Sequence, residues 1–64
     1  MIFYTTHCPK CKVLEIKLKQ KGISYTENED VQYMLSKGIQ SAPAIEYNGK
    51  IYLFSDAVKL INSL

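Results

Sequence analysis

The chain has two cysteines, Cys8 and Cys11, and only two residues separate them. A disulfide between them cannot staple a fold, because closing so short a loop removes little entropy from the unfolded chain. At 64 residues, the chain lies near the lower size limit for folding without staples. Its core must therefore come from aliphatic and aromatic side chains, and the composition (47% hydrophobic, 22% charged) is typical of a globular domain. We find no repeat, low-complexity segment or linker, and we expect a single domain, residues 1–64.

The spacing of the two cysteines favours redox chemistry. Cys8 precedes a run that is predicted to be helical, so it would occupy the N-cap, with Cys11 one turn further along and the two sulfurs within reach. Free backbone N–H groups and the helix dipole stabilise a thiolate at the N-cap. Pro9 suits the first helical turn, and Lys10 adds a nearby positive charge. We expect Cys8 to attack a substrate disulfide and Cys11 to resolve the product.

The first half of the chain predicts two strands with a helix between them, over Ile2–Thr5, Pro9–Lys21 and Ile23–Glu27. A strand, a helix and a strand within so few residues imply that the two strands are parallel. Cys11, Leu14 and Leu18 share one face of the helix. Val13 and Ile16 fall on a roughly opposite face, so we expect this helix to contact two neighbours.

The second half predicts a short helix, a hairpin and a final helix. Residues 28–30 supply an N-cap and acidic residues for a helix with an apolar stripe of Val31, Met34 and Leu35. The Asn-Gly pair at 48–49 lies between two runs of β-forming residues and is a strong hairpin signal. Ser55 and Asp56 are predicted to cap the last helix. The expected order of elements is βαβαββα.

That order, with Cys-Pro-Lys-Cys after the first strand, resembles a minimal thioredoxin fold of the glutaredoxin kind over essentially the whole chain. The resemblance implies an α/β fold with a four-stranded mixed sheet in the order 2-1-3-4, flanked by three helices. The first and third helices would cover one face and the second helix the other. The chain has no tryptophan, whereas thioredoxins place one beside the first cysteine, so the likeness is to glutaredoxins. The implied activity is that of a dithiol–disulfide oxidoreductase.

The sequence Ser41-Ala42-Pro43 is the second marker of this family. In glutaredoxins and thioredoxins, a proline that opens the third strand has a cis peptide bond and faces the cysteines. The resemblance implies that the Ala42–Pro43 bond is cis and that the backbone of Ala42 pairs with the incoming substrate. From the sequence spacing alone, an ordinary trans proline at the start of a strand is the alternative.

The resemblance also assigns a role to the start of the last helix. In glutaredoxins, helix N–H groups and an acidic side chain at this position hold the γ-glutamyl end of glutathione, which here implies Ser55 and Asp56. A plain helix cap is the alternative for Asp56. The glycine pair that glutaredoxins have before this helix is replaced by Leu53 and Phe54.

Other departures from the family leave the electron donor open. The loop before the first cysteine is one residue shorter than usual, and it lacks the basic residue that commonly binds a glutathione carboxylate. Lys10 stands where a tyrosine often lies. Related hydrogen donors of ribonucleotide reductase take electrons from thioredoxin reductase, but their Trp-Ser-Gly-Phe-Arg-Pro tail is also missing. Either glutathione or a thioredoxin reductase could therefore supply electrons, and we expect no cofactor bound to the chain itself.

Two alternatives concern metal binding and His7. Zinc prefers four ligands, and the chain offers only Cys8, Cys11 and His7, so a metal site or a shared iron–sulfur cluster would require a dimer. A dimeric metal-binding or iron–sulfur protein is thus the alternative function. His7 could lower the pKa of the adjacent cysteine as an imidazolium, or it could be an exposed loop residue.

The charge of the chain and its lack of targeting signals indicate which partners and which compartment to expect. The net charge is +2, and all eight basic residues are lysines, so no arginine is present for bidentate nucleic-acid contacts. The first residues lack the pattern of a signal peptide, and no apolar run approaches the roughly 20 residues of a membrane span. A small domain without several disulfides suits a reducing compartment. We expect a cytoplasmic monomer that acts on disulfide-containing proteins and binds neither nucleic acid nor membranes.

Overall fold

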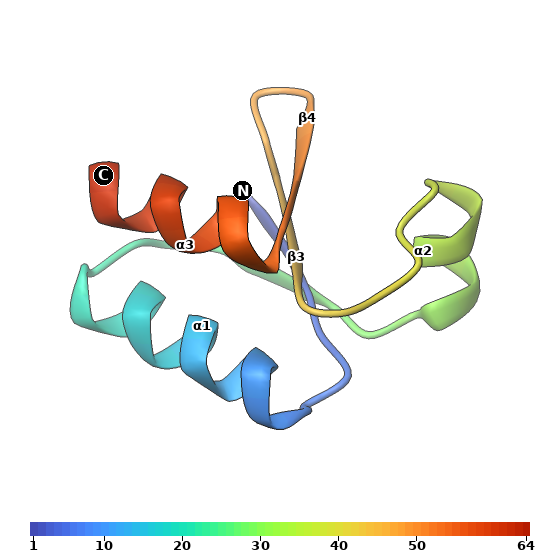
Figure 1. Ribbon diagram of the computed structural model, residues 1–64, viewed down its shortest axis with the longest axis horizontal. Coiled ribbons are helices and arrows are strands. Elements are labelled where there is room, and N and C mark those ends of the chain that lie inside the picture. The colour runs from blue at the N-terminus through green and yellow to red at the C-terminus, as the bar shows by residue number, and fades with distance from the viewer.

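The computed structural model describes residues 1–64 and has seven elements (Figure 1). In chain order they are β1 (Ile2–Tyr4), α1 (Pro9–Gln20), β2 (Thr26–Asn28), α2 (Val31–Ser36), β3 (Ala44–Tyr47), β4 (Lys50–Leu53) and α3 (Phe54–Ser63). The predicted order βαβαββα is confirmed. No helix has the length and apolar character that are needed to cross a membrane.

The four strands form one mixed sheet in the order β2-β1-β3-β4, as predicted. Strand β1 runs parallel to β2 and antiparallel to β3, and β3 pairs with β4 in an antiparallel hairpin. Asn48 and Gly49 form the hairpin turn with φ values of 52° and 76°. Both residue types tolerate this left-handed conformation, which explains why the sequence turns here.

Helices α1 and α3 cover one face of the sheet, and α2 lies on the other (Figure 1). Successive strand residues point to opposite faces, so the strands divide their side chains between two cores. Phe3 of β1 joins the core beneath α1 and α3, whereas its neighbour Tyr4 joins the core beneath α2. The predicted α/β architecture, with three helices around a four-stranded mixed sheet, is therefore present.

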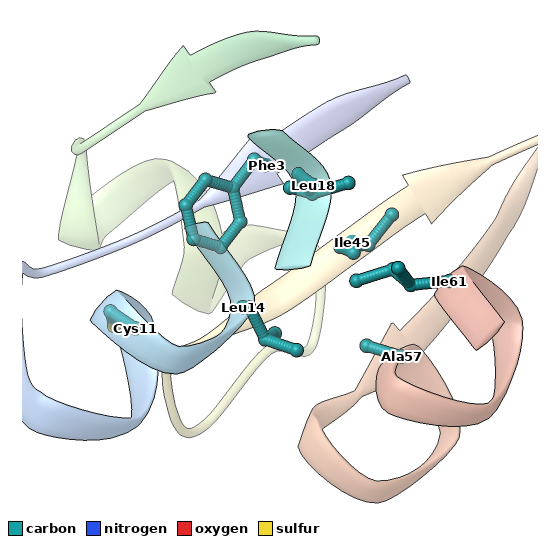
Figure 2. Packing of buried hydrophobic residues seen from close by; sticks show 7 residues of the cluster. All are labelled: Phe3, Cys11, Leu14, Leu18, Ile45, Ala57 and Ile61. Carbon is teal, nitrogen blue, oxygen red and sulfur yellow. The ribbon is translucent and has the colours of Figure 1, made fainter. Parts of the chain in front are cut away.

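The larger core consists of seven side chains that meet between α1, α3 and the sheet (Figure 2): Phe3, Cys11, Leu14, Leu18, Ile45, Ala57 and Ile61. All seven are almost fully buried. Burying one large aliphatic or aromatic side chain stabilises a fold by about 1.5–3 kcal/mol. This core includes Cys11, so packing of the first helix also fixes the position of one sulfur.

The second strand begins later than the sequence predicts. Strand β2 spans Thr26–Asn28, and the expected start at Ile23 is wrong. Gly22, which follows the C-cap of helix α1, lies in the left-handed region (φ 68°). The N–H of Ile23 donates to the carbonyl of Leu18 at 3.0 Å. This bond closes the helix in the manner of a Schellman motif, so Ile23 belongs to the helix end and cannot start the strand.

The predictions about apolar helix faces hold only in part. Helix α1 contacts two neighbours, the sheet and α3, as expected. It does so with a single stripe of side chains, so the expectation that Val13 and Ile16 face a neighbour is wrong, and they are 43% and 55% exposed. Helix α2 buries only Met34 of its predicted stripe and leaves Val31 and Leu35 in solvent.

The last helix starts earlier than predicted. Helix α3 begins at Phe54, its N-cap is Leu53, and no side chain caps it. Strand β4 runs straight into the helix without a loop, so its last residue occupies the cap position. Ser55 and Asp56 therefore lie in the first turn, and the prediction that they cap the helix is wrong.

Candidate functional site

One end of the sheet gathers the segments that carry the predicted site residues. The strand register aligns Asn28, Tyr4, Ala44 and Leu53 in one row across the sheet. The segments beyond this row therefore leave the sheet at the same end. They are residues 5–8, which lead into α1, residues 41–43, which precede β3, and residues 54–56, which open α3.

Cys8 occupies the N-cap of α1, as predicted. Its backbone is extended (φ −73°, ψ 168°), and Pro9 takes the first helical position. The N–H of Cys11 donates to Cys8 Sγ at 3.2 Å, and the N–H of Lys12 donates to the Cys8 carbonyl at 3.0 Å. A sulfur here takes the place of the oxygen of a usual N-cap residue and lies at the positive end of the helix dipole.

The two sulfurs lie next to each other but differ in exposure. Cys8 Sγ and Cys11 Sγ are 2.7 Å apart, and both cysteines are free thiols. Cys8 is half-buried, whereas Cys11 is 1% exposed within the larger core. Another molecule can therefore reach the sulfur of Cys8 more readily than that of Cys11.

The surroundings of Cys11 favour its thiolate. Burial raises the pKa of the Cys11 thiol, but hydrogen bonds outweigh this effect and lower it to about 7. One comes from the Cys8 thiol and another from the backbone N–H of Thr6, which lies 3.5 Å from Cys11 Sγ. A shared proton makes this value a property of the pair, so the dithiol loses its first proton near pH 7. Thr6 was not identified from the sequence, because a backbone donor leaves no residue-type signal.

His7 turns away from the sulfurs. Its backbone is left-handed (φ 59°), and its N–H donates to Thr5 Oγ1 at 3.0 Å. The imidazole Nε2 contacts the carboxylate of Glu29, and both side chains are exposed. This partner raises the pKa of His7. In the structure His7 is an exposed loop residue paired with Glu29, a partner that no sequence pattern indicated.

Lys10 connects the starts of α1 and α3. Its Nζ lies 5.4 Å from the centroid of the Phe54 ring, which is a cation–π distance. The lysine charge therefore contacts an aromatic face, and Phe54 itself packs against the larger core.

The Ala42–Pro43 peptide bond is cis, and Pro43 is buried. Ala42 and Cys8 both pack against the larger core. In contrast, Asp56 lines a shallow groove along β4 and the outer side of α3, together with Lys50 and Lys59. The structure brings Cys8 and Cys11 together at the end of the sheet where the Ala42–Pro43 segment also lies, and it directs Asp56 towards a different groove.

No family model, curated protein or solved structure matches the chain. No group of three or more His, Cys, Asp or Glu side chains in the chain lies close enough to hold a metal ion. The functional interpretation therefore depends on the geometry of the dithiol. An accessible sulfur at a helix N-terminus, beside a buried second sulfur, can form a transient bond to another sulfur and then release it.

Proposed function

We propose that this protein is a dithiol–disulfide oxidoreductase that reduces disulfides of proteins or small molecules through Cys8 and Cys11. The observation that carries the proposal is the pair of free sulfurs 2.7 Å apart, one accessible at the N-cap of α1 and one buried. A first pKa near 7 supports it, because the thiolate is the reactive form and is then abundant at neutral pH.

The reaction has two steps that balance in electrons and protons. With the shared proton on Cys11, the Cys8 thiolate attacks one substrate sulfur, a bond from Cys8 to that sulfur forms, the substrate disulfide breaks, and the leaving thiolate takes up the proton that Cys11 releases. Cys11 then attacks the Cys8 sulfur, forms the internal disulfide and releases the second substrate thiolate, which is also protonated. The protein loses two electrons, and the substrate gains two electrons and two protons.

The surroundings of the dithiol have supporting roles in this proposal. Pro9 starts the helix that stabilises the thiolate, and Lys10 contributes positive charge beside it. Ala42 and Pro43 would position the substrate's sulfur. Ser55 and Asp56 remain candidates for binding glutathione. However, Asp56 lines a groove that includes neither cysteine.

The finer classification is also a proposal: a minimal thioredoxin fold of the glutaredoxin kind. The observed element order, the strand order, the cysteines at the start of α1 and the cis Ala42–Pro43 bond support it. Glutathione or a thioredoxin reductase would return two electrons to the internal disulfide. A small domain with only two cysteines, and thus without several stapling disulfides, suits a reducing compartment, so we propose a cytoplasmic monomer that acts on disulfide-containing proteins.

Two variants test the assigned roles. We expect Cys8→Ser to abolish turnover of a model disulfide, and Cys11→Ser to perform only the first step and accumulate a mixed disulfide. Mass spectrometry would detect that adduct as an increase in mass. Trapping by Cys8→Ser in place of Cys11→Ser would reverse the roles of the two sulfurs.

The electron donor is tested by reducing the oxidised wild-type protein in parallel with glutathione plus glutathione reductase and with thioredoxin reductase, each followed by NADPH consumption. Turnover with either system supports the proposal and identifies the donor. A protein that reduces no disulfide and purifies as a zinc-loaded or coloured dimer with protected thiols would instead be a metal-binding or iron–sulfur protein.

A further inference from the structure

A second surface feature adjoins the dithiol on the α2 side of the sheet. It is a groove of about 130 Å³ with walls from the loop after β1, helix α2 and the segment before β3. Thr6 and Ala42 form part of these walls. The N–H of Thr6 donates to Cys11 Sγ, and Ala42 packs against the same core as Cys8. The groove therefore shares a residue, Thr6, with the surroundings of the buried sulfur, which itself lies 2.7 Å from Cys8 Sγ.

The walls of this groove are uncharged, although 22% of the residues in the chain are charged. Val31 and Leu35 of α2 line it and are 52% and 58% exposed. Met34, which lies between them in the sequence, is buried in the smaller core. Exposed apolar side chains that cluster beside a reactive group indicate an interaction site, because covering them removes apolar surface from water.

The backbone along the groove is free to bind a peptide. The N–H and C=O groups of residues 40–42 take part in no hydrogen bond within the chain, and this segment belongs to no helix or strand. An extended peptide could pair with these groups while one of its side chains enters the groove. A wholly apolar ligand would leave them unpaired.

The charge near α2 selects against one kind of occupant. Glu27, Glu29 and Asp30 lie at the end of β2 and just before α2, and no lysine lines the groove. Glu29 is the only one of the three with a basic partner, His7. A carboxylate entering the groove would therefore find no positive charge to pair with and would lose its hydration against uncharged, largely apolar walls.

On the premise that the protein reduces disulfides, we infer that this groove binds an aliphatic side chain next to the cysteine of an extended polypeptide substrate. The substrate class is then a protein disulfide with an aliphatic residue beside the reacting cysteine. An acidic residue at that position is disfavoured. A volume of about 130 Å³ suits one such side chain, since a cavity of about 150 Å³ holds a benzene molecule.

The test compares two peptide disulfides that differ only in having Leu or Asp next to the cysteine, with bis(2-hydroxyethyl) disulfide as a substrate without side chains. We expect the wild type to reduce the Leu peptide with a kcat/KM roughly tenfold above that of the Asp peptide, the lower range for pocket discrimination. Leu35→Asp should remove this preference, and Leu35→Lys should favour the Asp peptide. Neither variant should change the rate with the small disulfide.

Ile16→Asp is the matched control, because Ile16 is an aliphatic residue of similar exposure on α1, outside the groove. Equal rates for the two peptides, or equal effects of Leu35→Asp and Ile16→Asp, would overturn the inference and leave the proposed function intact. Failure of the wild type to reduce even the small disulfide would overturn the proposed function.

A binding measurement tests the groove without catalysis. The Cys8→Ser protein is titrated with peptides in which the cysteine is replaced by serine, and the methyl NMR signals of Val31 and Leu35 are followed. Shifts with the Leu peptide that exceed those with the Asp peptide support the inference. Shifts confined to other residues contradict it.

Discussion

At the scale of single residues, the buried sulfur of Cys11 interacts with two neighbours. It lies 2.7 Å from Cys8 Sγ, and the N–H of Thr6 donates to it. Both interactions stabilise a negative charge, and together with the Thr5 side chain and the backbone N–H of Cys8 they outweigh the effect of burial on the pKa. The lowered pKa of Cys11 thus originates in the local chain geometry, because His7 is paired with Glu29 and Lys10 contacts Phe54.

The formation of the thiolate should depend on pH in a way that reports this geometry. We expect the ultraviolet thiolate absorbance of the reduced protein to show a first transition near pH 7, below the ordinary thiol pKa of 9.0. His7→Ala should leave that transition unchanged, because the imidazole contacts Glu29. A transition that moves upward in His7→Ala would instead assign the stabilisation to the imidazolium.

At the scale of elements, helix α1 stabilises the fold through one buried face. Leu18 is fully buried in the larger core (Figure 2), whereas Ile16 is mostly exposed. We expect Leu18→Ala to lower the free energy of unfolding by about 2–5 kcal/mol. The matched change Ile16→Ala should alter it by less than about 0.5 kcal/mol, as surface substitutions usually do. Urea denaturation measures both, and similar losses would contradict the observed packing.

The same elements show how far the sequence could predict the structure. Cys8 at the N-cap and the turn at Asn48 depend on neighbouring residues only, and both were predicted correctly. The start of β2 was missed because the N–H of Ile23 bonds to the end of α1, which no strand pattern reveals. The helical periodicity also predicted that another element covers Ile16, which is instead exposed. Periodicity identifies apolar faces, but it does not show whether another element covers them.

The candidate site was also predicted only in part. The two cysteines and Pro43 carry residue-type signals, and the structure brings their segments to one end of the sheet. Thr6 acts through its backbone, and the groove beside α2 forms from three segments that lie far apart in the sequence. Such features follow from tertiary packing, so a pattern of residue types could not reveal them.

At the scale of the whole molecule, the dithiol couples redox state to stability through pH. The pKa of Cys11 falls from an ordinary value of 9.0 to about 7 on folding, so the folded protein releases a proton more readily than the unfolded chain. Stability from a depressed pKa is fully present above the unfolded value and is lost as the pH falls through the folded value. The reduced protein should therefore be more stable at pH 9 than at pH 6.

The oxidised protein provides the control, because its disulfide has no thiol proton to lose. His7 has a raised pKa, so its contribution to stability is present below about pH 6.5 and is lost as the pH rises through the folded value, in both redox states. Subtracting the oxidised from the reduced profile cancels this contribution. A shift of about two pKa units predicts that the remaining difference grows by about 2–3 kcal/mol between pH 6 and pH 9. Parallel urea titrations of the two forms measure it, and profiles that run parallel would show that folding does not stabilise the thiolate.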